Sequence, residues 1–274
     1  MTSATTSATT SMAPTPVESA EVLRARFEEL HGHWDERLQA LLELDRRMFA
    51  AHAGLLGVPE RRGVLCAKTR HLVHLAVAGA ATHLYGPGTE QHVRGALSAG
   101  ATQREVAEVL QLTGTLGIHA HNVGGAILDR VLRETGHLPE EPAPLTERQQ
   151  RLQESFEQRR GFWHEDFEQL LRLDPDLFEA YCEYSGLPWT DGVLEPRVRE
   201  FVYIAFDVAA THLHRPGIEQ HFRNALRHGA TPDELLAVLQ IASTLGTHGV
   251  LEGALDLADA RADAESTPDE KEPR

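Results

Sequence analysis

The sequence predicts an all-α protein made of two tandem copies of one helical domain. The first observation is a duplicated string, because ATHLYGPGTEQH at 81–92 returns as ATHLHRPGIEQH at 210–221. Of the 40 residues from 80 to 119, 24 are identical to the residue 129 positions later, without a gap. The second observation is that apolar residues recur at helical spacing while strand patterns are nearly absent. A period this long indicates a duplicated domain rather than a short solenoid repeat.

The chain has 274 residues, enough for two modest domains. The segment GHLPEEPAPLTER holds three prolines and an acidic pair, which are incompatible with a regular helix. We therefore expect a disordered leader at 1–19, a first repeat at 20–135, a linker at 136–148, a second repeat at 149–262 and a disordered acidic tail at 263–274.

The helices of the first copy follow from its apolar spacing. WDERLQALLELDRRMFAAHAGLLG, 34–57, predicts one helix that stops at a glycine. A second helix is predicted over 64–84, with an apolar face of small residues that suits close packing. Gly-Pro-Gly at 86–88 is expected to break the chain, and a short helix over 89–99 is expected to end at Gly100 in a left-handed cap.

In the second copy, VREFVYIAFDVAATHL is apolar nearly all round, which predicts the buried helix of the fold. Thr102 with Glu105, and Thr231 with Glu234, have the spacing of a capping box just before an apolar run. Pro232 stands at the first helical position, where its missing N–H has no cost. A helix is therefore predicted to start at this point in both copies.

Composition limits the class of protein. A net charge of −15 without a basic stripe argues against nucleic-acid binding. The N-terminus lacks the basic start and apolar run of a signal peptide, and no stretch approaches 18 uninterrupted apolar residues. Cys66 and Cys182 occupy unmatched positions, so neither a disulfide framework nor a zinc–thiolate site is expected. We expect a cytoplasmic protein with no membrane partner.

The segment His92-Val-Arg-Gly-Ala-Leu-Ser-Ala-Gly-Ala-Thr-Gln-Arg-Glu-Val-Ala-Glu-Val-Leu-Gln, and its counterpart that begins at His221, resemble the carboxymuconolactone decarboxylase family, which also holds the alkyl hydroperoxidase D-like proteins. The resemblance covers roughly 34–132 and 163–260. It implies a compact helical domain that oligomerises through its helices, commonly as trimers or hexamers. A fused pair would act as a built-in dimer, so the resemblance implies a homo-oligomer such as a trimer with a pseudo-hexameric arrangement.

The peroxidase branch of this family works through Cys-x-x-Cys followed by a histidine. That histidine matches His92 and His221, but the segments where the cysteines should fall, 83–88 and 212–217, contain none. Because a thiolate is the redox centre of that chemistry, peroxidase activity is excluded. The decarboxylase branch, which needs neither cysteine nor cofactor, stays open. The resemblance thus implies a lyase or isomerase acting on a small carboxylated lactone or related acid.

Few residues retained in both copies can do such chemistry. Decarboxylation needs an acid/base of near-neutral pKa and donors to a developing oxyanion, which histidine can supply. His92 and His221 are the first choice as general acid/base, with a buried structural histidine as the equally weighted alternative. The other candidates are His83, His212, His119 and His248, which would orient the substrate or stabilise the enolate, with Glu90 and Glu219 supporting the histidines.

Further residues are candidates for substrate binding. If one copy alone is active, the first is favoured, because it adds Tyr85 and His121 to the shared histidines and glutamate. Arg70 and Arg199 lie at matching positions and could bind a substrate carboxylate in bidentate fashion. An ordinary pair with an acidic neighbour is at least as good an explanation of both arginines.

Two other classes of function remain open. The main prediction has no cofactor and no metal, but His83, His92, His119 and Glu90 could instead bind zinc or another first-row ion in a metal-dependent enzyme. Their spacing gives little support, because Glu90 and His92 point about 200° apart on a regular helix. The second alternative is a non-catalytic oligomeric module whose histidines form hydrogen bonds within a helix interface.

Overall fold

A computed structural model describes residues 18–164 and 166–266 of the chain. All regular secondary structure in these residues is helical, as predicted. The chain divides into two compact units, which are described separately. The smaller unit comprises residues 18–57 and 249–266, and the larger unit comprises residues 58–248 without residue 165. The predicted leader lies outside the described residues up to position 17, and the predicted tail from position 267 onward.

The smaller unit holds the first three helices of the chain and the last. They are α1 (Ala20–His31), α2 (Glu36–Leu44), the larger part of α3 (Arg46–Arg62) and nearly all of α14 (His248–Ser266). Phe27, Leu41 and Phe49 form its apolar core together with Ala254 of α14. The last helix of the second repeat therefore packs with the first helices of the first repeat.

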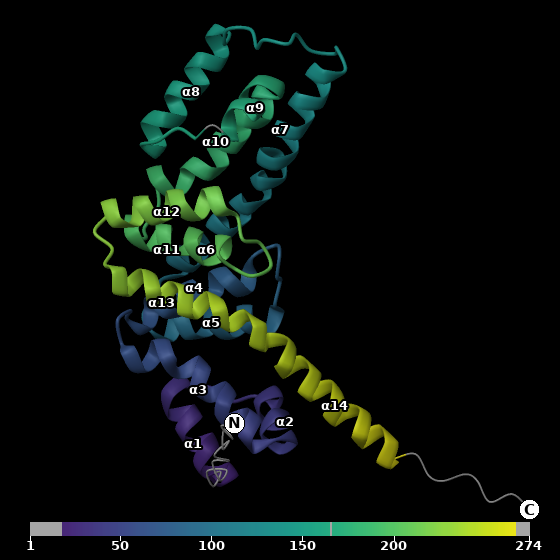
Figure 1. Ribbon diagram of the computed structural model, residues 1–274. Helices are drawn as coiled ribbons and strands as arrows, with labels where there is room; N and C mark the ends of the chain where they lie inside the picture. The colour runs from purple at the N-terminus through teal and green to yellow at the C-terminus, as the bar shows by residue number, and fades with distance from the viewer. Residues whose placement is uncertain (1–17, 165, 267–274) are drawn as a thin grey trace, which may run out of the picture. The chain divides into compact units, whose positions relative to one another are not determined.

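The larger unit contains every remaining element (Figure 1). These are α4 (Ala67–Gly79), α5 (Gly86–Ser98), α6 (Gln103–Gly114), η1 (Thr115–Ile118), α7 (His119–Glu134), α8 (Glu147–Arg160), α9 (Asp166–Leu173), α10 (Pro175–Thr190), α11 (Pro196–Asp207), α12 (Arg215–Arg227), α13 (Pro232–Ser243) and η2 (Thr244–Thr247).

The main core of the larger unit joins α4–α6 of the first repeat to α11–α13 of the second. Every residue of α11 from Val198 to Asp207 is buried, which confirms the prediction of a buried helix over this segment. The burial includes two carboxylates, Glu200 and Asp207, which have no exposed surface. An apolar core thus encloses two acidic side chains, and both belong to the same helix.

A second cluster of the larger unit packs the end of η1 against the helices that follow the linker. Ile118, the last residue of η1, joins Phe156 of α8, Leu170 of α9 and Phe178 of α10. Figure 1 shows α7 running beside α9, which it contacts. The last helix of the first repeat therefore packs on the first helices of the second repeat.

Within the larger unit, the two repeats are related by an internal pseudo-two-fold axis. Thr82 and Thr211, which occupy equivalent positions 129 residues apart, meet through their hydroxyls at 3.5 Å. His83 contacts His248, and their counterparts His212 and His119 contact each other. Such reciprocity is what an isologous two-fold interface produces in a homodimer. The duplication has therefore built a dimer-like interface into one chain.

Several local predictions are confirmed. Thr102 and Thr231 accept hydrogen bonds from the third backbone N–H of α6 and α13, and Glu105 and Glu234 complete both capping boxes. Pro232 occupies the first turn of α13. Gly100 has the left-handed φ of +89° predicted for it.

Other boundaries differ from the prediction. The helix expected over 34–57 is divided into α2 and α3, because the Asp45 carboxylate accepts from the Arg47 and Met48 backbone N–H groups and so starts a new helix. Gly-Pro-Gly at 86–88 begins α5 rather than breaking the chain. The break lies earlier, in the turn before Tyr85, where Leu84 adopts a φ of +48°. Residues 263–266 of the expected disordered tail are helical.

The described residues include one helical stretch, Pro232–Glu265, with the length and apolar content of a membrane span and a mean hydropathy of 1.2. A single stretch of this kind is weak evidence, because a core helix of a soluble protein passes the same test. Val238 and Ile241 in this stretch are fully buried in the protein's own core, which accounts for its apolar content.

Candidate functional site

The two buried carboxylates of α11 gather histidines from both repeats. Glu200 and Asp207 are seven residues apart, so they lie on the same face of the helix. The residues around them are His119 at the start of α7, His212 and His214 in the turn before α12, and His221 within α12. We call these six residues the carboxylate site. All of them lie in the larger unit.

His221 and Glu200 form the tightest pair of this site. Nδ1 of His221 lies 2.6 Å from Oε2 of Glu200, and Asn224 donates its amide to the other carboxylate oxygen at 3.3 Å. Tyr203 stacks on the imidazole, with 4.3 Å between ring centroids. Because an ionised carboxylate can only accept, Nδ1 of His221 carries the proton. The pair fixes the ring orientation and its tautomer, and leaves Nε2 as the reactive nitrogen.

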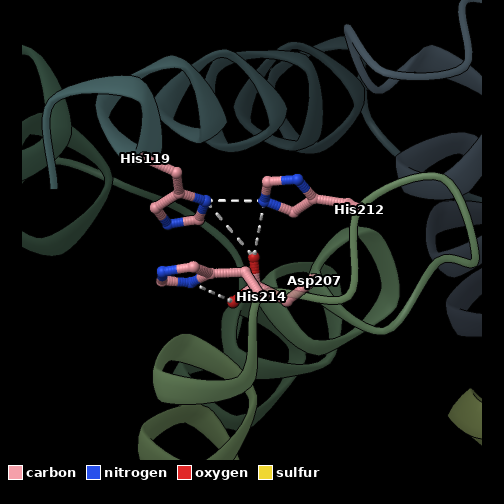
Figure 2. Close-up of side chains that lie close together, drawn as sticks. All are labelled: His119, Asp207, His212 and His214. Atoms are coloured by element: carbon pink, nitrogen blue, oxygen red, sulfur yellow. Dashed lines mark hydrogen bonds and ion pairs between the residues drawn. The ribbon is translucent and has the colours of Figure 1, made fainter. Parts of the chain in front are cut away.

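Asp207 lies beside the other three histidines of the site (Figure 2). Nδ1 of His119 and Nε2 of His212 are 2.7 Å apart, and each is 3.8 Å from Oδ1 of Asp207. Nδ1 of His214 is 4.0 Å from Oδ2. Burial, aided by the neighbouring histidines, lowers the pKa of His119 to about 2, and burial also lowers the pKa of His212. At neutral pH these two imidazoles are therefore uncharged.

The carboxylate of Asp207 is unusual for a buried charge. It has no exposed surface, and neither oxygen accepts a hydrogen bond. Asp207 is also the last residue of α11, where the helix dipole disfavours a negative charge. Gly217 in the first turn of α12 lies so close that a Cβ there would overlap Oδ2. The absence of a side chain at Gly217 is what allows this close approach.

A pocket opens between α7, α8, α10, α11 and α12, and its lining includes His119, His214 and His221. Arg160, the last residue of α8, supplies a cation to the same lining. It donates from Nη1 to the Ser185 carbonyl at 3.2 Å and the Tyr203 hydroxyl at 3.4 Å, and its buried Nε has no hydrogen-bond partner. Among the described residues it forms no ion pair. The guanidinium is therefore available to an anionic ligand.

The equivalent positions of the other repeat form a different cluster in the larger unit, with the same backbone. We call it the histidine site, and its residues are His71, His74, His83, Tyr85, His92 and His248. His92 lies 3.2 Å from His71 between Nδ1 atoms and stacks on His74 at 4.4 Å. His83 contacts His248 at 2.8 Å, and Tyr85 stacks on His248 at 4.2 Å. No residue of α4 is acidic, so His92 receives no carboxylate from the helix that corresponds to α11.

The predicted histidines lie in these two sites, but not in the predicted groups. His92 and His221 are both buried. Burial is compatible with a general acid/base and with a structural histidine, so it does not decide between these two roles. The first-copy group that was favoured as one site is divided, because His119 lies with His212 while His83 lies with His248. The physical reason is the exchange of terminal helices between repeats, which carries the start of α7 and of α14 to the opposite copy.

The predicted glutamates point away from the sites. Glu90 pairs with Arg94 and Glu219 with Arg223, one helical turn along, and all four side chains are more than 65% exposed. Two residues along a helix from His92 or His221 is the opposite face, so neither carboxylate can support its histidine. The carboxylates that do reach the histidines come from α11.

The predicted binding residues are also placed elsewhere. Arg199 pairs with Glu108 at 2.6 Å in the core, and Arg70 donates to the Leu65 carbonyl at 2.6 Å. His121 lines a separate groove with Tyr184 and Leu177. Tyr85 lies in the histidine site.

The metal set His83, His92, His119 and Glu90 is not brought together, since its members are divided between two sites and the surface. A different set with metal-binding spacing is His119, Asp207, His212 and His214.

Three residues of the carboxylate site, and Arg160 of the adjoining pocket, were missed from the sequence. Glu200 and Asp207 had a usable signal, because two acids in an otherwise apolar, buried helix must serve some purpose. His214 stands in the duplicated string where the first copy has Tyr85, and this difference was a signal too. Arg160 ends an ordinary charged helix, and nothing in its sequence context separates it from Arg159.

Comparisons with known proteins agree with this architecture. The model of the carboxymuconolactone decarboxylase family matches residues 42–117 and 175–260. A crystal structure from Burkholderia xenovorans LB400, described as a "putative gamma-carboxymuconolactone decarboxylase subunit", is 47% identical. It covers 91% of this chain and 100% of its own, with a TM-score of 0.88. A comparison with curated proteins found no match.

The family model covers more than half of the chain, in two segments that correspond to the two repeats. The similar crystal structure extends the agreement to nearly the whole chain. This chain belongs to the carboxymuconolactone decarboxylase family.

Proposed function

We propose that the carboxylate site catalyses decarboxylation, or a related isomerisation, of a small carboxylated lactone or similar acid. The observation that carries this proposal is the Glu200–His221 pair at 2.6 Å, whose imidazole lines the same pocket as the half-buried cation Arg160. Family membership and the description of the similar crystal structure support the same reaction class. The Glu200–His221 pair supplies an oriented acid/base, and the guanidinium of Arg160 attracts an anionic substrate.

Arg160 would hold a carboxylate of the substrate. A guanidinium binds a carboxylate through two parallel hydrogen bonds, and Arg160 has a free buried Nε for one of them. The carboxylate it holds should be one that the substrate keeps. A strong bond to the departing carboxylate would stabilise the ground state and slow its loss. The proposal therefore favours a substrate with a second anionic group.

The chemical step follows from the pair. As the carboxylate leaves as CO2, the electrons of its C–C bond move into the conjugated lactone carbonyl and give an enolate. The protonated His221 then donates its Nε2 proton to the enolate carbon, and solvent restores the imidazolium. Glu200 stabilises the imidazolium before transfer, because it accepts from Nδ1. The amide of Gln220, which lines the pocket, could donate to the developing oxyanion.

The histidine site is the weaker candidate for this step. His92 faces His71 rather than a carboxylate at the position of Glu200. A neutral imidazole gives no comparable stabilisation of an imidazolium. The step as proposed uses side chains alone and needs no cofactor.

The test begins with a panel of carboxylated lactones and related acids, assayed for CO2 release by the full-length protein. For the substrate found, Glu200→Gln should lower kcat by about 10²-fold or more, because general acid–base catalysis contributes about 10²–10⁴-fold. Arg160→Gln should act mainly by raising KM. If Glu200→Gln leaves kcat unchanged in a correctly folded protein, this acid/base assignment is wrong.

A homo-oligomer remains part of the proposal. Val123, Ile127 and Leu128 on α7 are each at least half exposed. An apolar stripe of this kind suits a helix–helix contact between copies. Light scattering during size exclusion would give the number of chains, and a monomer at working concentration would exclude this arrangement.

A further inference from the structure

We propose that His119, Asp207, His212 and His214 bind a divalent first-row transition-metal ion such as zinc or iron(II). None of these residues except His119 belongs to the metal set considered from the sequence. The side chains come from both repeats, and Figure 2 shows the three histidines gathered around the Asp207 carboxylate. Imidazole and carboxylate together form a ligand set suited to such ions.

The spacing of the ligand atoms fits an ion. One ligand atom from each of the four residues lies within 4.8 Å of all the others. Four ligands about 2.0–2.1 Å from a tetrahedral zinc ion lie about 3.3 Å from one another. The 2.7 Å between His119 and His212 must widen by about 0.6 Å, and the 3.8 Å from each to Asp207 must shorten by about 0.5 Å. Small rotations of side chains achieve both changes.

The burial of Asp207 without a hydrogen-bond donor is a second, independent observation. Its carboxylate is fully buried, and both oxygens lack a hydrogen-bond donor. Burying an ionised carboxylate costs several kcal/mol unless a partner compensates for it. Asp207 ends α11, so its own helix adds to the cost, while the first turn of α12 at Gly217 offsets part of it. A divalent ion would compensate the remainder.

A metal-free explanation exists and makes different predictions. His119 and His212 could form an ordinary hydrogen bond to each other. His214 could serve only as the cap of α12, since its Nδ1 accepts from the Gly217 N–H at 3.2 Å. This explanation leaves the Asp207 oxygens without any donor, and it predicts that no ion changes the stability of the protein.

The chain supplies a matched control in the histidine site. There His248, His83 and Tyr85 replace His119, His212 and His214, and Ala78 replaces Asp207. The backbone is equivalent, but the carboxylate and one histidine are missing. One ion per chain is therefore expected, and not two.

His119 and His214 line the pocket, so the ion would lie in its wall. There it could stabilise negative charge on a bound acid, and the proposed reaction would then no longer be free of a cofactor. The inference does not rest on the proposed reaction, because binding is measured without a substrate. Loss of activity without loss of metal, or the reverse, separates the two proposals.

The first experiment is elemental analysis of untagged full-length protein, followed by titration of the stripped protein with Co²⁺ and Zn²⁺. We expect about one ion per chain and a visible Co²⁺ spectrum typical of protein ligands. Asp207→Asn should weaken Zn²⁺ binding at least tenfold, while His83→Ala should leave it unchanged. No bound ion and no Co²⁺ spectrum in the parent protein would overturn the proposal, as would loss of binding in His83→Ala alone.

Thermal unfolding guards against a variant that fails to fold. Saturating Zn²⁺ should raise the Tm of the parent protein, because a ligand that binds the native state stabilises it. In Asp207→Asn the Zn²⁺ shift should be largely lost, while the Tm without metal should be equal or higher, since an uncompensated charge has been removed. An equal Zn²⁺ shift in both proteins would contradict the assignment of Asp207 as a ligand.

Discussion

The carboxylate site and the histidine site show how one scaffold can be duplicated while its chemistry is not. The backbone and three histidines are retained: His83, His92 and His119 occupy positions equivalent to His212, His221 and His248. The residues that differ lie on the preceding helix and in the turn between the two helices. They are Glu200 in place of His71, Tyr203 in place of His74, Asp207 in place of Ala78 and His214 in place of Tyr85.

The difference is one of buried charge. α11 brings two carboxylates into the core, while α4 brings only histidines and apolar residues. An imidazole paired with a carboxylate can hold and release a proton at little cost, whereas two facing imidazoles disfavour a shared charge. His92 and His221 therefore mark the position of the two sites, and the residues that contact them from the preceding helix determine the chemistry of each site.

The largest expected effect comes from converting the carboxylate site into its counterpart. Glu200→His copies the residue at position 71 and removes the carboxylate from His221. We expect kcat for CO2 release to fall by about 10²–10⁴-fold, because the imidazolium loses its stabilising partner. His71→Gln is the matched control and should change kcat by less than about twofold. Equal losses in the two variants would mean that the sites are not functionally distinct.

A second effect contrasts the two matched arginines. Arg199 and Glu108 form a pair that is less than 10% exposed, and Glu108 also accepts from the Val193 and Leu194 N–H groups. Arg199→Ala leaves that carboxylate buried without its cation. We expect the free energy of unfolding to fall by about 3–5 kcal/mol.

The control for this prediction is Arg70→Ala. Arg70 is 3.8 Å from Glu60, and its side chain is 19% exposed, so the expected loss is about 1–2 kcal/mol. Urea unfolding of both variants measures the difference. If Arg199→Ala costs no more than Arg70→Ala, the buried pair does not have the structural role assigned to it.

The third effect compares His52 with Tyr181, which holds the same position in the second repeat. Burial lowers the pKa of His52 to about 4, below the ~6.5 of an exposed histidine. Between pH 4 and about pH 6.5, the unfolded chain therefore binds a proton at His52 that the folded chain does not bind. The stabilisation is complete above about pH 6.5 and is lost as the pH falls toward 4.

The stabilisation from holding His52 neutral amounts to about 3.5 kcal/mol at most, at about 1.4 kcal/mol per pK unit. His52→Tyr copies the second repeat and should flatten the decline in the free energy of unfolding between pH 6.5 and 4. Urea unfolding across this pH range is the measurement. An unchanged slope would show that His52 is not held neutral in the folded state.

The smallest effect belongs to the glutamates first considered for the site. Glu90→Ala and Glu219→Ala each remove an exposed ion pair between residues one helical turn apart. We expect less than about 0.5 kcal/mol in stability and no change in kcat. A tenfold loss of activity in either variant would show that the substituted glutamate contributes to catalysis.

The sequence predicted the elements well because their signals are local. Capping boxes at Thr102 and Thr231 and the apolar run of α11 depend on residues within one or two turns. It also identified the histidines that the duplication kept, but not His214, whose counterpart is Tyr85. What it missed depends on contacts between distant segments. His119 meets His212 only because α7 packs with the second repeat, and Arg160 reaches the pocket only through the end of α8.

The assignment of acid/base chemistry to the carboxylate site, and not to the histidine site, is tested by comparing two variants. The measurement is the kcat of His221→Gln beside that of His92→Gln, with the same substrate and with folding verified by circular dichroism. We expect a loss of at least about 10²-fold for His221→Gln and nearly full activity for His92→Gln. Full activity in His221→Gln, or the larger loss in His92→Gln, would contradict it.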